Sequence, residues 1–431
     1  MRAMKDSGIE WIGQIPQEWD VRKIKHCFNV YAGATPKSGN SEFWDGDIVW
    51  VTPADYTTEQ KYVSEGRKSI TSEGFESCST EMIPAGSLIF SKRAPIGLVA
   101  INTVDLCTNQ GCLSCVPLDK NDVEYFYYAF SCFTEQFDLY GSGTTFKEIS
   151  ADAFVNFPIP YPTITTQQKI SEYLRSRCAE INALIAAKEK TNALLKERRQ
   201  SIIYEAVTKG LNPDAPMKDS GNEWIGQIPG NWTTWRMKHL ASEPLQYGAN
   251  ATGVEFREDI PRYVRITDIT ADRKLSNDGK QSLETDMAQD YMLEDGDILF
   301  ARSGATSGKS FYYEEKYGSC CFAGYLIKLR TDNRKALSKF LYYYTLTQAY
   351  ENWTQQIFIQ ATIQNISADK YNNLWFAIPG SLDEQADIVA YLDQRCSEMD
   401  ELISANEATI QKLKEYRQSV IYEAVTGKIE I

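Results

Sequence analysis

The stretch RCAEINALIAAKEKTNALLKERRQSIIYEAVT, residues 177–208, occurs a second time as RCSEMDELISANEATIQKLKEYRQSVIYEAVT, residues 395–426. The two copies align without a gap, and 20 of 32 positions are identical. Neither copy contains Gly or Pro, and both are rich in Ala, Leu, Glu, Lys and Gln, so each is predicted to form one long helix. At about 1.5 Å per residue, such a helix is on the order of 48 Å long.

A narrow apolar seam, spaced alternately by three and four residues, runs along each copy. A seam of this width favours packing against a similar helix, and we therefore expect the two copies to pair with each other, running antiparallel. The alternative is that each helix packs only on its own globular body. The apolar seam positions are Ile181, Leu184, Leu195 and Ile202 in the first copy and Met399, Leu402, Leu413 and Val420 in the second.

The repeat extends beyond the helices. KDSGIEWIGQIP, residues 5–16, returns as KDSGNEWIGQIP, residues 218–229, so the chain is an internal tandem duplication. This indicates two similar globular bodies, each followed by a long helix. The expected segments are a first body over 1–165, a helix over 166–208, a linker over 209–221, a second body over 222–383 and a helix over 384–427.

Each body combines strand-like and helical patterns. DIVWV at 47–51 and DILF at 297–300 are typical of buried strands. The aromatic stretches at 123–133 and 339–350 have helical spacing and are predicted to lie in the core. The sequence therefore predicts a mixed α/β (α+β) fold for both bodies.

Composition restricts the class of protein. The 431 residues carry a formal net charge of −13, ten Cys and only two His. No secretory signal and no membrane-spanning apolar run is evident, so we expect a cytoplasmic protein with reduced thiols. Two His leave little room for His-based catalysis. An acidic total does not exclude nucleic-acid binding, which needs only a local basic patch.

Two basic, Gly-containing loops follow equivalent strands. They are SKRAPIGL at 91–98 and SGATSGKS at 303–310, and both are predicted to contact a phosphate backbone. The second loop nearly matches a nucleotide-binding P-loop, but a strand-like run follows it where that motif needs a helix. Solvated hairpins are the alternative. The candidate DNA contacts in these loops are Lys92, Arg93, Arg302, Ser303, Thr306 and Lys309.

Polar turns supply a second group of candidate DNA contacts. GSGTTFK at 141–147 and IQATIQN at 359–365 both precede the repeated sequence ISAD, and CTNQG occupies 107–111. Amide and hydroxyl side chains on turns suit the recognition of base edges, although they are also ordinary turn residues. The candidates are Asn109, Gln110, Thr144, Thr145, Lys147, Thr362 and Gln364.

Catalytic and metal-binding patterns are weak. Asp55, Glu59 and Lys61 faintly resemble the carboxylate–lysine cluster of Mg²⁺-dependent nucleases, but the second body has no counterpart. The cysteines in 107–115 have the spacing of some iron–sulfur ligands, which alternation in a strand explains better. We therefore expect no catalytic site and no metal site in this chain.

The chain resembles the DNA specificity subunit of type I restriction–modification systems. The resemblance lies in the doubled KDSGxEWIGQIP, the doubled RQSxIYEAVT helix end, the linker KGLNPDAPMKDSG and the FPIPYP…QQ entry to the first helix, and it covers nearly the whole length. It implies that the bodies are two target-recognition domains and that the helices form an antiparallel coiled coil. It also implies two modification (methyltransferase) subunits, restriction (translocase-nuclease) subunits, and SAM, ATP and Mg²⁺ bound by those partners and not by this chain.

The leading hypothesis is a non-catalytic subunit that recognises a bipartite, asymmetric sequence in double-stranded DNA. Because the bodies share a fold but differ in their loops, the two half-sites should differ. One alternative is a helical protein scaffold that does not recognise DNA. Another is a stand-alone Mg²⁺-dependent nuclease that uses the acidic cluster at 55–61.

Overall fold

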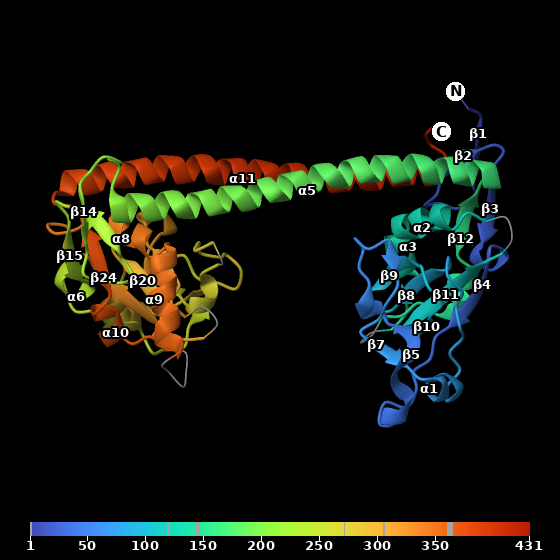
Figure 1. Ribbon diagram of the computed structural model, residues 1–431, viewed down its shortest axis with the longest axis horizontal. Coiled ribbons are helices and arrows are strands. Elements are labelled where there is room, and N and C mark those ends of the chain that lie inside the picture. The colour runs from blue at the N-terminus through green and yellow to red at the C-terminus, as the bar shows by residue number, and fades with distance from the viewer. Residues whose placement is uncertain (1, 119–120, 144–146, 271, 305–306, 360–364) are drawn as a thin grey trace. The chain divides into compact units, whose positions relative to one another are not determined.

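The computed structural model in Figure 1 describes residues 2–118, 121–143, 147–270, 272–304, 307–359 and 365–431. The chain forms two compact units. Unit 1 comprises residues 1–188 and 407–431, and unit 2 comprises residues 189–406. The long helices α5 (Ile164–Lys209) and α11 (Leu382–Val425), green and red in Figure 1, therefore each contribute one part to each unit.

Unit 1 is built on a five-stranded sheet. Its order is β4 (Phe28–Ala32), β11 (Cys112–Pro117), β8 (Leu88–Lys92), β9 (Ile96–Asn102) and β6 (Tyr62–Val63), antiparallel except for β6 beside β9. The smaller sheets are β10 (Cys107–Thr108) with β5 (Trp44–Val51) and β7 (Lys68–Ile70), β12 (Pro158–Tyr161) with β3 (Asp20–Lys23), and β1 (Met4–Asp6) with β2 (Gln14–Pro16).

Short helices pack on the sheets of unit 1. Besides α5 and α11, the helices of this unit include α1 (Ser72–Glu76), α2 (Val123–Cys132), α3 (Thr134–Leu139) and α4 (Ala151–Val155), of which α2 and α3 pack on β9. The aromatic face of α2 is buried, as the sequence predicts: Phe126 and Phe130 pack edge-on against Phe28 and Phe90. This aromatic core fixes the sheet relative to the helices.

Unit 2 repeats the plan with shorter strands. One sheet has the order β16 (Gln246–Tyr247), β23 (Leu326–Leu329), β20 (Ile298–Ala301) and β21 (Ser310–Tyr312). Another has the order β17 (Val254–Glu255), β19 (Gln281–Ser282), β18 (Arg262–Val264) and β22 (Cys320–Phe322). The remaining elements are β15 (Thr233–Arg236) with β24 (Trp375–Ile378), β13 (Met217–Asp219) with β14 (Gln227–Pro229), and helices α6 (Met237–Leu240), α7 (Thr285–Ala288), α8 (Ser338–Tyr344), α9 (Gln348–Ile359) and α10 (Ala368–Asn372).

The long helices run antiparallel, as the sequence predicts. In unit 1, Arg417 donates a hydrogen bond to the Asn182 side chain. In unit 2, Asn406 Nδ2 donates to Asn192 Oδ1 over 2.8 Å, and Arg199 Nε lies 3.6 Å from an Asp400 carboxylate oxygen. As the residue numbers of the contacts increase along α5, those of their partners on α11 decrease, which is the register of an antiparallel pair.

The predicted seam is partly wrong. Ile181, Ile202, Met399 and Val420 are buried, and Leu195 and Leu413 are half-buried. Leu184 and Leu402, however, are 56% and 55% exposed, and their neighbours Ile185 and Ile403 are buried instead. Because both positions of each pair are apolar, periodicity alone does not choose between them.

The body of unit 1 sets the phase of the seam. Ile170, Leu174 and Cys178 are buried in its core. Steps of three and four residues that start from Cys178 lead to Ile181 and then to Ile185. The helix surface that faces the partner is therefore decided by packing of the helix start on the body.

Helix boundaries lie close to the expected ones. The helix α5 starts at Ile164 and ends at Lys209, and α11 ends at Val425, where Gly427 adopts a positive φ of 69°. Glycine just past a helix end commonly takes this left-handed conformation. Part of the expected linker is ordered, because Met217–Asp219 forms strand β13.

The doubled motif packs on a helix end in both units. In unit 1, Tyr422 of α11 donates to the Trp11 carbonyl, and Trp19 lies in the core with the last turns of α11. In unit 2, Trp232 lies in the core with the last turns of α5. In unit 2 this packing brings together two segments that are separated by a short linker. In unit 1 it brings together the N-terminal and C-terminal segments of the chain.

Within the described ranges, the helices include none that is long and apolar enough to cross a membrane.

Candidate nucleic-acid interface

The two groups of polar residues predicted in the first body lie side by side in unit 1. Strand β8 ends at Lys92, and Arg93 forms an isolated antiparallel bridge with Glu148. The Ile149 amide donates to the Lys92 carbonyl over 3.0 Å. The loop at 91–98 and the turn that precedes ISAD therefore form one surface.

Carboxylates accompany the cations of this surface. Lys92 Nζ lies 2.7 Å from Glu148 Oε1, and Arg93 Nη1 lies 3.4 Å from Glu148 Oε2. Lys147 Nζ lies 2.5 Å from Asp138 Oδ2. The hydrogen bond from Lys92 is the main reason why the pKa of the Glu148 carboxyl lies below its usual value. These cations are thus held in place by charge before any ligand binds.

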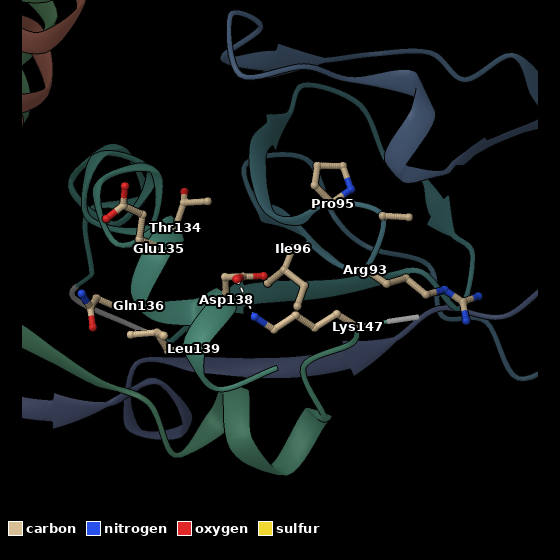
Figure 2. Close-up of a pocket in the computed structure, with 10 residues that line it drawn as sticks. Arg93, Pro95, Ile96, Thr134, Glu135, Gln136, Asp138, Leu139 and Lys147 are labelled. Carbon is tan, nitrogen blue, oxygen red and sulfur yellow. Dashed lines mark hydrogen bonds and ion pairs between the residues drawn. The ribbon is translucent and has the colours of Figure 1, made fainter. Parts of the chain in front are cut away.

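A groove adjoins the same residues in Figure 2. It has a volume of about 990 Å³ and is lined from the β8–β9 loop, from α3 and from Lys147. Lys147 extends toward Asp138 in Figure 2, whereas the Arg93 guanidinium points away from that pair. Leu139, at the end of α3, is 72% exposed. The surface therefore combines charged groups with an exposed apolar wall.

Asn109 and Gln110 lie in the turn between β10 and β11. The Lys92 amide donates to the Gly111 carbonyl over 2.9 Å, which places this turn beside the end of β8. Asn109 Oδ1 accepts a 2.9 Å hydrogen bond from the Gly111 amide, so its oxygen stabilises the turn. Gln110 is exposed and accepts a hydrogen bond from Thr35. Of the two, Gln110 is the better placed to contact a ligand.

Unit 2 has the same backbone arrangement beyond the end of β20, with other side chains. The Arg302 amide donates to the Tyr325 carbonyl over 3.0 Å, and the Ile366 amide donates to the Arg302 carbonyl over 2.8 Å. Ser303 forms an isolated antiparallel bridge with Asn365. Arg302 is therefore equivalent to Lys92, and Asn365 to Glu148.

Aromatic rings replace the carboxylate here. The Arg302 guanidinium lies 4.9 Å from the centroid of the Tyr247 ring. Tyr247 and Tyr325 are 40% and 61% exposed. Exposed aromatic rings next to an arginine provide stacking and cation–π contacts for bases.

The loop between β20 and β21 is a closed hairpin, not a P-loop. The Ala301 amide donates to the Lys309 carbonyl over 2.8 Å, and Ser310 begins strand β21. A strand thus stands where a P-loop requires a helix, as the sequence indicates. Five candidate contacts lie outside the described residues: Thr144, Thr145, Thr306, Thr362 and Gln364.

Sequence analysis missed Glu148, Asn365, Tyr247 and Tyr325. A signal existed for the first two, because each directly precedes the repeated ISAD. The tyrosines gave no such signal, since their place beside Arg302 depends on strand pairing between distant segments.

Two of the three residues of the nuclease hypothesis, Asp55 and Lys61, are engaged in other contacts. One Asp55 oxygen accepts a 2.7 Å hydrogen bond from the Thr52 amide in a capping box. Lys61 Nζ lies 3.0 Å from Glu124 Oε1. The described ranges contain no group of three or more His, Cys, Asp or Glu side chains that is suited to a metal ion. Burial raises the pKa of the Cys112 thiol to about 12, so it is a protonated core residue.

Comparison with known proteins identifies the family. The family model described as "Type I restriction modification DNA specificity domain" matches residues 16–194 and 260–414. The type I restriction enzyme MjaIX specificity subunit of Methanocaldococcus jannaschii is 35% identical over 247 residues, which are 56% of this chain and 55% of that protein. The StySPI specificity subunit of Salmonella potsdam is 25% identical over 67% of this chain and 61% of its own length. The chain thus spans less than two thirds of these two relatives.

Solved structures share the fold. A chain from a study of complex assembly and conformational transition of the type I R-M system has a TM-score of 0.73 at 16% identity, and the alignment covers 96% of this chain and 99% of that one. The HsdS subunit of Thermoanaerobacter tengcongensis has a TM-score of 0.51 at 17% identity over 96% and 98% of the two chains. Because the family model matches more than half of the sequence, in two stretches that correspond to the two repeats, the chain belongs to the family of type I restriction–modification specificity subunits.

Proposed function

We propose that this chain is the non-catalytic specificity subunit of a cytoplasmic type I restriction–modification complex. In this proposal each unit recognises one half of a bipartite sequence in double-stranded DNA. The observation that supports it best is the surface built twice from a strand end and the segment before ISAD, which bears Arg93 in unit 1 and Arg302 in unit 2. Cations on an exposed loop suit phosphates and guanine edges.

The two half-sites should differ in sequence. Unit 1 presents cations paired with carboxylates, whereas unit 2 presents an arginine beside exposed tyrosines. Because base recognition depends on the donors and acceptors that reach the groove, these surfaces should prefer different bases. Both long helices belong to both units, so we expect a fixed number of unspecified bases between the halves.

We further propose that two modification subunits dock on the long helices and that restriction subunits then join. Exposed apolar side chains on these helices support docking: Leu184, Leu194 and Leu402 are each more than half exposed. Contiguous exposed apolar patches mark surfaces that another protein covers, and in this proposal the leucines contribute to such a patch. SAM, ATP and Mg²⁺ would then be bound by the partners.

Sequencing of methylated bases tests the proposal. The chain is expressed with its methyltransferase partner, and methylated positions are mapped in genomic DNA by single-molecule sequencing. The proposal expects a split motif with unlike halves and a fixed gap. A continuous motif would refute separate recognition by the two units.

A protein scaffold without DNA recognition is the second candidate. The pairing of Lys92, Arg93 and Lys147 with carboxylates favours it, because these ion pairs compete with phosphate binding. To distinguish the two candidate functions, the purified complex of this chain with the methyltransferase is bound to a randomised DNA library. A scaffold would bind the methyltransferase but enrich no sequence.

A further inference from the structure

One backbone position differs in chemistry between the two units. Arg93 bridges to Glu148 in unit 1, and Ser303 bridges to Asn365 in unit 2. Arg93 directly follows β8, and Ser303 lies two residues after the end of β20. Their bridge partners, Glu148 and Asn365, each directly precede ISAD. The same scaffold thus presents a guanidinium–carboxylate pair in one unit and two uncharged side chains in the other.

The geometry of unit 1 leaves Arg93 available for a ligand. The side chain is 37% exposed, and its contact with Glu148 is made by Nη1 at 3.4 Å. Glu148 is the one side chain among the described residues that pairs with this guanidinium. A guanidinium has five N–H donors, so donors remain for a bidentate partner. The Glu148 carboxylate is in turn fixed by Lys92 Nζ at 2.7 Å.

Prior orientation of Arg93 favours base recognition over loose phosphate contact. A long arginine side chain loses rotamer freedom when it binds, and a carboxylate that already restrains it removes part of that loss. The planar fork matches O6 and N7 of guanine in the major groove. Lys92 and Lys147 offer point charges without a fork and suit phosphates instead.

We propose that Arg93 recognises a guanine in the half-site of unit 1 and that Glu148 is the positioning residue that orients it. The inference rests on the proposed function, because it names a base contact of that same surface. Unit 2, with Ser303 and Asn365 at this position, lacks the pair and so does not specify guanine through it.

The test compares methylated motifs of single variants in the full chain, co-expressed with the methyltransferase. Arg93→Ala should relax one guanine of the first half-site to any base, which is a loss of discrimination of roughly 5- to 150-fold at that position. The second half-site and the gap should stay unchanged. Lys147→Ala is the matched control: loss of a phosphate contact should lower methylation at all sites and leave the motif intact.

Variants at Glu148 test the positioning role. Glu148→Gln should weaken discrimination at the same guanine and at no other position, because an amide does not hold the guanidinium by charge. Glu148→Asp keeps the charge and should restore most of the discrimination. Ser303→Ala, at the equivalent position of unit 2, should leave the first half-site unchanged.

Several results would overturn the inference. One is an Arg93→Ala motif identical to the wild-type motif, and another is a relaxed position in the second half-site. Wild-type discrimination in Glu148→Gln would remove its positioning role. If a variant does not methylate in cells, selection from a randomised DNA library by the purified complex measures the same positions. A wild-type chain without a split motif would refute the proposed function itself, which is a different result from an unchanged split motif in Arg93→Ala.

Discussion

Unit 1 and unit 2 agree where the segment that follows the doubled motif meets a long helix. They differ just beyond the ends of the inner strands β8 and β20. Trp19 and Trp232 are both fully buried against the last turns of a helix. Beyond these strand ends, by contrast, Glu148 binds two cations in unit 1, and Asn365 stands in its place in unit 2. The comparison teaches that packing was kept after duplication while the exposed surface changed.

The largest expected effect concerns the shared packing. Trp19→Ala and Trp232→Ala should each lower the free energy of unfolding by about 3–5 kcal/mol, because each removes a large buried ring. Urea unfolding followed by circular dichroism measures this loss. Trp235→Ala, which removes a ring that is 40% exposed, is the control and should have a much smaller effect. A loss in Trp19→Ala or Trp232→Ala as small as the loss in Trp235→Ala would contradict the shared packing role of the two buried rings.

A second pair of variants tests the seam. Ile185→Ala should lower the free energy of unfolding by about 2 kcal/mol, since Ile185 is 7% exposed. Leu184→Ala, one residue away and 56% exposed, should change it by less than about 0.5 kcal/mol. Thermal unfolding of the isolated chain is the measurement. A larger loss in Leu184→Ala than in Ile185→Ala would instead support the seam predicted from periodicity, in which Leu184 is buried.

A smaller difference separates the two tryptophans. Trp232 Nε1 donates to Glu384 Oε1 over 2.7 Å, whereas Trp19 Nε1 is buried without a hydrogen-bond partner among the described residues. Trp232→Phe should therefore lower the free energy of unfolding by about 1 kcal/mol more than Trp19→Phe. Urea unfolding of both variants provides the comparison, and equal losses would mean that this hydrogen bond contributes nothing.

The smallest expected effect is a pH dependence of stability that arises from Glu148, beside the end of β8 in unit 1. The pKa of Glu148 is lowered from 4.5, chiefly by its hydrogen bond from Lys92, so its contribution to stability is fully present above pH 4.5 and is lost as the pH falls through the folded-state pKa. At a partly exposed site this contribution is below about 1 kcal/mol. An NMR titration of the Glu148 carboxyl should give a pKa below 4.5 that rises in Lys92→Ala. Asn365, at the equivalent position of unit 2, has no titratable group, so the stability of that surface should not change over this pH range.

Prediction of the site from sequence was uneven for physical reasons. Lys92, Arg93 and Arg302 could be predicted as DNA contacts because basic residues in a Gly-containing loop after a strand leave a local pattern, and they remain predictions. Their partners did not follow from local pattern. Whether Glu148 neutralises a cation or Tyr247 lies under a guanidinium depends on which strands pair, and strand pairing joins residues far apart in the chain.

The sequence by itself determined the duplication, the two long helices, the mixed α/β bodies and the family, because each depends on repeated or periodic residues. Tertiary structure alone decided that Ile185, and not Leu184, is buried in the helix seam, since both are apolar and only packing of the helix start on the body sets the phase. It also decided that the C-terminal end of α11 packs on the N-terminal motif of unit 1. That contact closes a separation of about four hundred residues, as in the hydrogen bond from Tyr422 to Trp11, which no local pattern encodes.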